Sequence, residues 1–175
     1  VENENYIHPK LPNYEITEGV IKGIYCLKKK TNSKGPKIQL LASGPMLNEA
    51  IKASKLLKSD WGIDSTIWSV TSYTELHKEA EDIERWNNLN PDKNKKIFFI
   101  NKNIKKTNGP VLAISDYVKL VAEQISPYIN CPFLALGTDG FGRSGTRDSL
   151  REFFEVNKYY ITLSSINLLI KDEQI

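Results

Sequence analysis

The feature that most constrains the fold is an alternation of short apolar runs with longer amphipathic segments. Residues 37–43, 63–70, 111–115 and 131–137 are apolar enough to form buried strands, and a segment with helical spacing follows each of them. Parallel strands have this character because helices cover both faces of their sheet. The pattern therefore predicts a three-layer α/β/α sandwich.

One additional strand is predicted near the start. Residues 20–27 (VIKGIYCL) and 37–43 (KIQLLAS) flank a polar turn that ends in Gly-Pro, which is typical of an antiparallel hairpin. We therefore expect an α/β domain over residues 16–175, with about five strands that are mostly parallel and one that is antiparallel. Residues 1–15, which contain two prolines, are predicted to be an extended segment leading into this domain.

Local signals place the ends of the helices. Gly62 is expected to end a helix that begins near residue 46, and Asn90, which precedes a proline, is expected to end the next one. Thr146 is predicted to cap a short helix, and the last helix should begin near Asn157. Residues 95–104 (KKIFFINKNI) are compatible with either a strand or a short helix.

Composition excludes several classes of protein. The net charge is only +3, and the lysine clusters lie in polar connections without interleaved aromatic residues, which argues against nucleic-acid binding. No apolar run approaches the length of a membrane span, and the start lacks the apolar core of a signal peptide. Two distant cysteines favour a reducing, cytoplasmic location. Because the chain begins at Val1 rather than Met, we expect a fragment or a processed product.

Residues 140–145 (GFGRSG) match the G-x-G-x-x-G pattern of dinucleotide-binding turns, between an apolar run and a helical one. Such a site also needs an acidic residue about 20 positions later, but residues 162–167 (TLSSIN) contain none. The motif also lies near the end of the chain rather than at the start of a nucleotide-binding half. We therefore favour a flexible loop at the carboxyl end of the last strand.

A second partial motif overlaps the first. Thiamine diphosphate enzymes use Gly-Asp-Gly followed by Asn, and here Thr138-Asp139-Gly140 is followed by Asn167. The first glycine is missing, and Asn167 falls inside a predicted helix. We therefore predict no metal-binding and no cofactor-binding residues in this chain.

The histidines and cysteines have no partners at meaningful spacing. His8 and His77 are interpreted as solvated, and Cys26 and Cys131 as small buried hydrophobic residues. The hydroxyl groups of residues 69–76 are interpreted as helix caps, because Ser and Thr favour that position. No catalytic residue is predicted.

Arg143 and Arg147 flank the glycine-rich turn at the start of a predicted helix. This arrangement suits an anion or carboxylate site. It suits a salt-bridged loop at a protein interface equally well, and the residues alone leave both interpretations open.

Longer segments carry a family resemblance. Residues 136–156 (LGTDGFGRSGTRDSLREFFEV) closely resemble the last segment of the bacterial homodimeric pyruvate dehydrogenases, the thiamine-dependent decarboxylating enzymes of the pyruvate dehydrogenase complex. Earlier segments match this transketolase-like family in the same order: ITEGVIKGIYCL, KIQLLASGPMLNEAIKASKLLKSDWGI, WSVTSYTELHKEAEDIERWNNLNP and GPVLAISDYVKLVAEQI. The resemblance extends from about Asn5 to Lys171.

The resemblance implies a carboxy-terminal, non-catalytic domain of a much longer enzyme. That parent oxidoreductase would decarboxylate pyruvate and transfer the acetyl group to the lipoyl group of its partner, the dihydrolipoamide acetyltransferase component. Thiamine diphosphate and Mg²⁺ would bind to preceding domains, whose catalytic glutamate, Gly-Asp-Gly…Asn motif and histidines are not matched here. The isolated chain is therefore expected to be inactive.

The same resemblance assigns this domain to assembly of the homodimer, with residues 138–147 facing the subunit interface. The candidate polar contacts are Asp139, Arg143, Ser144 and Arg147. The family often has an aspartate where this chain has Gly145, which makes the third glycine of the motif incidental. The alternative, from another class, is a free-standing nucleotide- or anion-binding module that uses residues 140–145.

Overall fold

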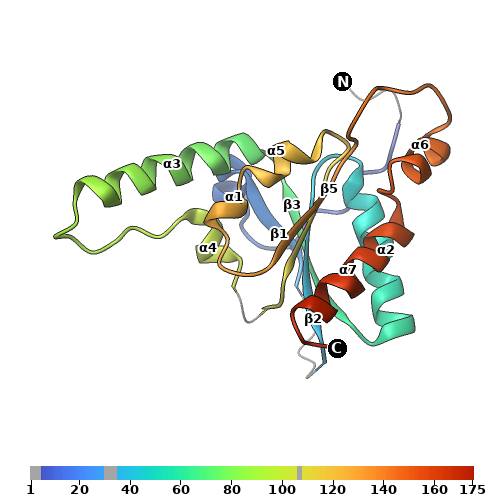
Figure 1. Cartoon of the computed structure of the whole chain (residues 1–175), viewed down its shortest axis with the longest axis horizontal. Coiled ribbons are helices and arrows are strands. Elements are labelled where there is room, and N and C mark those ends of the chain that lie inside the picture. Colours follow the sequence, from blue (N-terminus) through green and yellow to red (C-terminus); the bar gives the residue numbers. More distant parts are fainter. Residues whose placement is uncertain (1–4, 30–34, 106–107) are drawn as a thin grey trace.

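The computed structural model describes residues 5–29, 35–105 and 108–175. Within them, five strands form one sheet between two layers of helices (Figure 1). The strands are β1 (Ile24–Lys28), β2 (Lys37–Ala42), β3 (Asp64–Val70), β4 (Val111–Ile114) and β5 (Phe133–Leu136). Their spatial order is β1-β3-β2-β4-β5, with only β1 antiparallel to its neighbour. The predicted fold class is confirmed.

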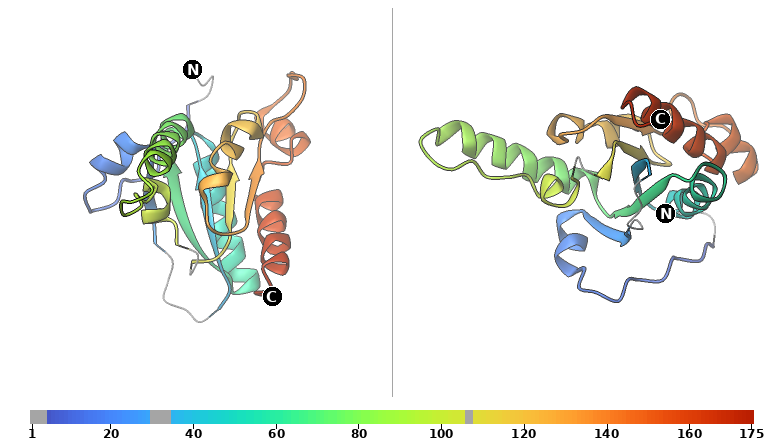
Figure 2. Two further views of the ribbon diagram at one scale, coloured as in Figure 1. Left: turned by 60° about the vertical axis from the view of Figure 1, so that its left-hand side comes forward. Right: turned by 90° about the horizontal axis from the view of Figure 1, so that it is seen from below.

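Helices cover both faces of the sheet. They are α1 (Thr17–Lys22), α2 (Met46–Trp61), α3 (Tyr73–Leu89), α4 (Phe99–Asn103), α5 (Lys119–Glu123), α6 (Arg147–Phe153) and α7 (Lys158–Lys171). The helices α2 and α7, which run in the same general direction, pack together on one face, while α3, α4 and α5 lie on the other (Figures 1 and 2). Residues 5–16, which we call the leading segment, contain no helix or strand.

The predicted hairpin is wrong. β1 pairs with β3, placing Ile24 opposite Val70, and does not pair with β2. The connection through α2 returns β3 parallel to β2, so β3 occupies the edge of β2 that a hairpin partner would need. Part of the predicted strand is also helical, because α1 continues to Lys22 and ends at Gly23 with a φ of 100°.

The central strands divide the core into two apolar clusters. On the α2 and α7 side, Leu40 and Leu112 are fully buried, and on the α3 side Leu41 and Ala113 are fully buried. Alternate residues point to opposite faces of a strand, so β2 and β4 supply both clusters. Complete burial of a leucine stabilises a fold by about 1.5–3 kcal/mol, so these strands contribute substantially to stability.

The structure shows the extent of the helix after β4 and the conformation of residues 95–104. The helix expected after β4 is short, since α5 stops at Glu123 and a separate 3₁₀ turn covers Ser126–Tyr128. Pro127 occupies that turn and has no N–H to continue the helix. The ambiguous residues 95–104 contain a helix, α4, not a strand.

The predicted helix ends are confirmed. Gly62 ends α2 in the left-handed conformation, with φ of 66°, and α3 ends at Leu89, before Asn90. The Thr146 side chain caps α6, and the Asn157 side chain caps α7.

Gly109 provides a test of the fold. It has a φ of +87°, and a Cβ atom there would lie 1.7 Å from the carbonyl oxygen of Lys37. We expect Gly109→Ala to lower the free energy of unfolding by more than about 2 kcal/mol, because left-handed backbone alone costs about 1–2 kcal/mol for other residues. Urea denaturation measures this. Gly142→Ala is the control, since a Cβ there meets nothing within 4 Å; equal effects of the two changes would contradict the fold.

Candidate functional site

Residues 137–146, which we call the glycine loop, leave β5 at the edge of the sheet where the parallel strands end. The first part of the loop is tied to the segment after β4. The amide of Thr138 donates to the carbonyl of Tyr117 at 2.9 Å, and its hydroxyl donates to the carbonyl of Asp116 at 2.9 Å. Gly137 permits this approach, because a Cβ there would lie 2.5 Å from the amide nitrogen of Lys119.

Asp139 anchors the next part of the loop. Its Oδ1 accepts the amide of Lys119 at 2.9 Å, and its Oδ2 lies 3.1 Å from the Lys119 ammonium. The backbone hydrogen bond from Lys119 is the main cause that lowers the pKa of the Asp139 carboxyl, and the same pair raises the pKa of Lys119. Both carboxylate oxygens contact Lys119 within the domain, so Asp139 tethers the glycine loop to the start of α5.

The tip of the loop is exposed. Gly140 has a φ of 93°, and the Phe141 side chain that follows is 95% exposed. The Arg143 guanidinium lies 3.9 Å from the centroid of the Phe153 ring of α6, which holds the far side of the loop against that helix. The loop therefore presents a large aromatic side chain and a stacked arginine to the outside.

A pocket of about 380 Å³ lies beneath the loop. Its walls include Met46 at the start of α2 and Asp116 after β4, and three arginines from the loop and α6. These arginines are Arg143, Arg147 and Arg151. The structure thus brings Arg143 and Arg147 to the wall of one cavity, while Ser144 is exposed on the loop.

Glu49 is a residue of this site that the sequence analysis missed. Its side chain is buried, and it joins α2 to both helices that follow the loop: Oε2 accepts the amide of Lys158 at 3.0 Å, and Oε1 lies 3.7 Å from Arg151. Lys52 also contacts Oε1, at 2.7 Å. The available signal was a glutamate next to Met46 and Ala50 on the apolar stripe of an amphipathic helix.

The glycine pattern does not form a dinucleotide turn. Ten residues separate the end of β5 from α6, whereas the dinucleotide motif makes a tight turn directly from strand to helix. α6 has only seven residues, and its first turn is capped by Thr146, which accepts the amide of Ser149 at 3.3 Å. Gly145 is placed by packing instead, because a Cβ there would lie 2.9 Å from the Ser149 hydroxyl.

The partial thiamine motif is not assembled either. Asp139 is held by Lys119 at the edge of the sheet, while Asn167 lies exposed within α7. In the described part of the chain, no three His, Cys, Asp or Glu residues gather as they would around a metal ion. The described residues therefore do not assemble the Mg²⁺-binding motif of thiamine diphosphate enzymes.

The two histidines and two cysteines that the sequence analysis considered have the following surroundings. His8 is exposed, with its ring 4.8 Å from that of Tyr6. The prediction of a solvated His77 is wrong, because His77 is partly buried and its Nδ1 lies 3.2 Å from the carbonyl of Gln124, at the end of the neighbouring helix α5. Cys26 and Cys131 are half-buried rather than buried, and burial raises the pKa of the Cys26 thiol.

The hydroxyl-rich segment after β3 caps a helix, as predicted. The Ser72 side chain accepts the amide of Glu75 at 3.1 Å at the start of α3. The Thr71 hydroxyl donates to the carbonyl of Val20 at 2.8 Å and so holds α1 against the end of β3.

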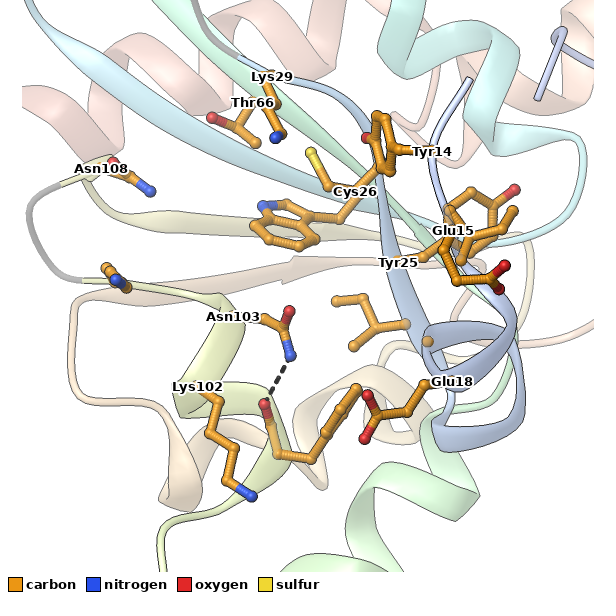
Figure 3. Close-up of a pocket in the computed structure, with 16 residues that line it drawn as sticks. Tyr14, Glu15, Glu18, Tyr25, Cys26, Lys29, Thr66, Lys102, Asn103 and Asn108 are labelled. Atoms are coloured by element: carbon orange, nitrogen blue, oxygen red, sulfur yellow. Dashed lines mark hydrogen bonds between the residues drawn. The ribbon is translucent and has the colours of Figure 1, made fainter. Parts of the chain in front are cut away.

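A larger cavity, of about 670 Å³, opens on the other side of the sheet between α1 and α4 (Figure 3). Tyr14, Cys26 and Thr66 line it, together with Trp68, whose buried Nε1 has no hydrogen-bond acceptor in the described chain. Burial, followed by the hydrogen bond and proximity to Cys26, raises the pKa of Tyr14 to about 12. The sequence analysis missed this cavity, because it exists only when β1 pairs with β3.

Comparison with known proteins identifies the family. The model of the transketolase-like TK C-terminal domain matches residues 23–157, which include the whole sheet and the glycine loop. The chain belongs to this family.

Curated relatives match almost all of the chain. Proteins named pyruvate dehydrogenase E1 component are 45% identical over 97% of the chain in Cupriavidus necator and 41% identical over 99% in Escherichia coli. One from Buchnera aphidicola is 46% identical over 95% of the chain. The chain spans only 19%, 19% and 18% of these relatives' own lengths, respectively.

Solved structures share the fold. A transketolase from Pichia stipitis gives a TM-score of 0.61 at 18% identity, covering 94% of this chain and 20% of that one. A transketolase from Leishmania mexicana gives 0.56 at 18% identity, covering 88% of this chain and 19% of that one. Among the described residues, no helix is both long and apolar enough to cross a membrane.

The tether at Asp139 predicts a pH dependence of the glycine loop. Because the pKa of Asp139 is lowered in the folded state, its contribution is fully present above the ordinary aspartate pKa and is lost as pH falls through the lowered value. We expect the Lys119 amide resonance to shift in that acidic range in NMR titrations. Asp139→Asn should abolish this transition, whereas Lys119→Met should move it to higher pH. A transition that persists in Asp139→Asn would contradict the assignment.

Proposed function

We propose that this chain is the carboxy-terminal, non-catalytic domain of a bacterial pyruvate dehydrogenase. The observation that carries the proposal is 41–46% identity across nearly the whole chain to proteins of that name, of which the chain spans about a fifth. The membership of the transketolase-like C-terminal family supports its place in the longer polypeptide.

The parent enzyme would act in the pyruvate dehydrogenase complex. It would decarboxylate pyruvate on thiamine diphosphate and transfer the acetyl group to the lipoyl group of the acetyltransferase component. Mg²⁺ and the cofactor would be held by parts of the parent outside residues 1–175, because Asp139 and Asn167 do not come together here as a Gly-Asp-Gly…Asn motif. The location would be cytoplasmic.

The role of the domain itself would be assembly of the homodimer through the glycine loop. Phe141 supports this role, because an aromatic side chain that is 95% exposed on an anchored loop is the kind of residue that buries into a partner surface. Arg143, Ser144 and Arg147 would supply polar contacts around it, while Asp139 holds the loop in position.

A free-standing nucleotide-binding module is the less well supported function. The long connection from β5 to α6 and the self-capped, seven-residue α6 leave no N-terminal helix site for a pyrophosphate. Anion binding by the three arginines is also weakened by Glu49, which lies beside Arg151.

The interface role can be tested in the full-length enzyme. Arg143→Ala combined with Arg147→Ala should raise the dimer dissociation constant by at least about tenfold, since contacts of this kind contribute on the order of 1 kcal/mol or more. Analytical ultracentrifugation measures the constant. Lys55→Ala with Lys171→Ala is the matched control, because both lysines are exposed and lie away from the loop. Unchanged dimer stability and activity in the arginine variant would rule out this role for the loop.

The nucleotide alternative has its own test. Calorimetric titration of residues 1–175 with NAD and with thiamine diphosphate should give no heat of binding, because the glycine loop leads to no open helix N-terminus. The full-length enzyme titrated with thiamine diphosphate serves as the positive control. Binding of either compound to residues 1–175 at micromolar concentration would overturn the proposed function in favour of the module.

A further inference from the structure

A long arm projects from one side of the domain. It consists of the second half of α3 and the segment that returns from it, residues 81–98, and extends well beyond the other elements (Figures 1 and 2). The nine α3 residues from Glu81 to Leu89 alone span about 13 Å at 1.5 Å per residue. We call residues 81–98 the arm.

The arm has almost no packing of its own. The buried residues of α3 are Tyr73, Leu76 and Ala80, all in its first half, and no residue of the arm is buried. A helical segment of this length is marginal in water without tertiary support. The arm therefore contributes little to the core of the domain.

The arm is nevertheless fixed in shape. Asn87 and Lys96 exchange two hydrogen bonds, of 3.0 and 2.8 Å, that join the helix to the returning segment. The Lys96 ammonium lies 4.1 Å from the centroid of the Trp86 ring, and the Asn90 side chain donates to the carbonyl of Trp86 at 2.8 Å. Much of the entropy of ordering this surface is therefore already lost before any partner binds.

The exposed surface of the arm suits a protein partner. Leu89, at the end of α3, is 68% exposed, and Ile97, on the returning segment, is 58% exposed, so each limb of the arm presents one large apolar side chain. Around them the charges are divided between the two limbs. The helical limb, residues 81–89, carries three acidic side chains and one arginine, whereas the returning limb, residues 90–98, carries three lysines and one aspartate.

This division makes the arm complementary to a copy of itself. Under a two-fold axis, the acidic limb of one arm can lie against the lysine-rich limb of the other, and each contact then occurs twice. Leu89 and Ile97 would be covered in the same contact. A partner of uniform charge would match only one limb.

The position of the arm also favours contact with another molecule. The start of the leading segment lies over the start of α2, away from the arm, where the carbonyl of Ile7 accepts the Asn48 side chain at 3.2 Å (Figure 1). Any part of the parent polypeptide that joins through this segment therefore connects to the domain far from the tip of the arm.

We propose that the arm docks on a second copy of the parent polypeptide, through Leu89, Ile97 and the two oppositely charged limbs. This proposal rests on the proposed function, in which the parent enzyme is a homodimer. It adds a second contact of this domain, separate from the glycine loop.

Site-specific cross-linking of the full-length enzyme tests the contact. A photoreactive amino acid at position 89 should link two subunits into a product of twice the subunit mass, and mixing two differently tagged subunits should give a doubly tagged product. The same amino acid at position 163 is the control, because Leu163 is 53% exposed on α7, away from the arm. Cross-links only within one subunit, only to the acetyltransferase component, or no cross-links at all would overturn the proposal.

Substitution gives an independent measurement. Leu89→Asp with Ile97→Asp should raise the dimer dissociation constant at least tenfold, with little change in the far-ultraviolet circular dichroism of the enzyme, because neither side chain is buried in the domain. Leu163→Asp should leave the constant unchanged. A dissociation constant equal to that of the unmodified enzyme in the arm variant would overturn the proposal.

The proposals for the arm and for the glycine loop can be rejected separately. Cross-links between subunits at position 89, combined with an intact dimer in the Arg143 and Arg147 variant, would support the arm and reject the loop. A dimer that depends on the two arginines and is unaffected at the arm would reject only the arm. A parent enzyme that is monomeric would reject both.

Discussion

The strand β2 is hydrogen-bonded along both edges and covered on both faces, and this constraint organises the rest of the domain. β3 and β4 lie parallel to β2 on either side, and Ile38, Leu40 and Leu41 are fully buried. Parallel neighbours can be reached only through long crossovers, so the chain must pass over the faces of the sheet between strands. Those crossovers supply α2 and α3, and the same requirement leaves β1 with only the outer edge of β3.

The parallel arrangement also determines where polar groups collect. β2, β4 and β5 all end at one edge, where the turn before α2, the segment after β4 and the glycine loop meet. Asp139 and Thr138 fasten the loop to the neighbouring connection, and Glu49 fastens the helices behind it. An exposed loop can present Phe141 in a defined position because its two ends are held in this way.

Much of the fold could be predicted because the decisive signals are local. Gly62 ends α2, Asn157 caps α7, and the apolar composition of the strands indicates that they are buried. The prediction of a hairpin was wrong because strand pairing depends on which strand edges remain free after the crossovers form. This is not a local property of the sequence. For the same reason the cavity beside Cys26 and the buried links of Glu49 could not be foreseen, although the loop and its arginines could.

The sequence by itself determined the layer structure, the helix ends and the family resemblance, because periodicity, caps and long ordered segments are properties of neighbouring residues. Only the tertiary structure decided that the GFGRSG pattern is an anchored, exposed loop rather than a nucleotide turn, since this depends on the distance from β5 to α6 and on Lys119 reaching Asp139. It also decided that half of α3 leaves the body as an arm, because an amphipathic pattern predicts a helix but not how far the core beneath it extends.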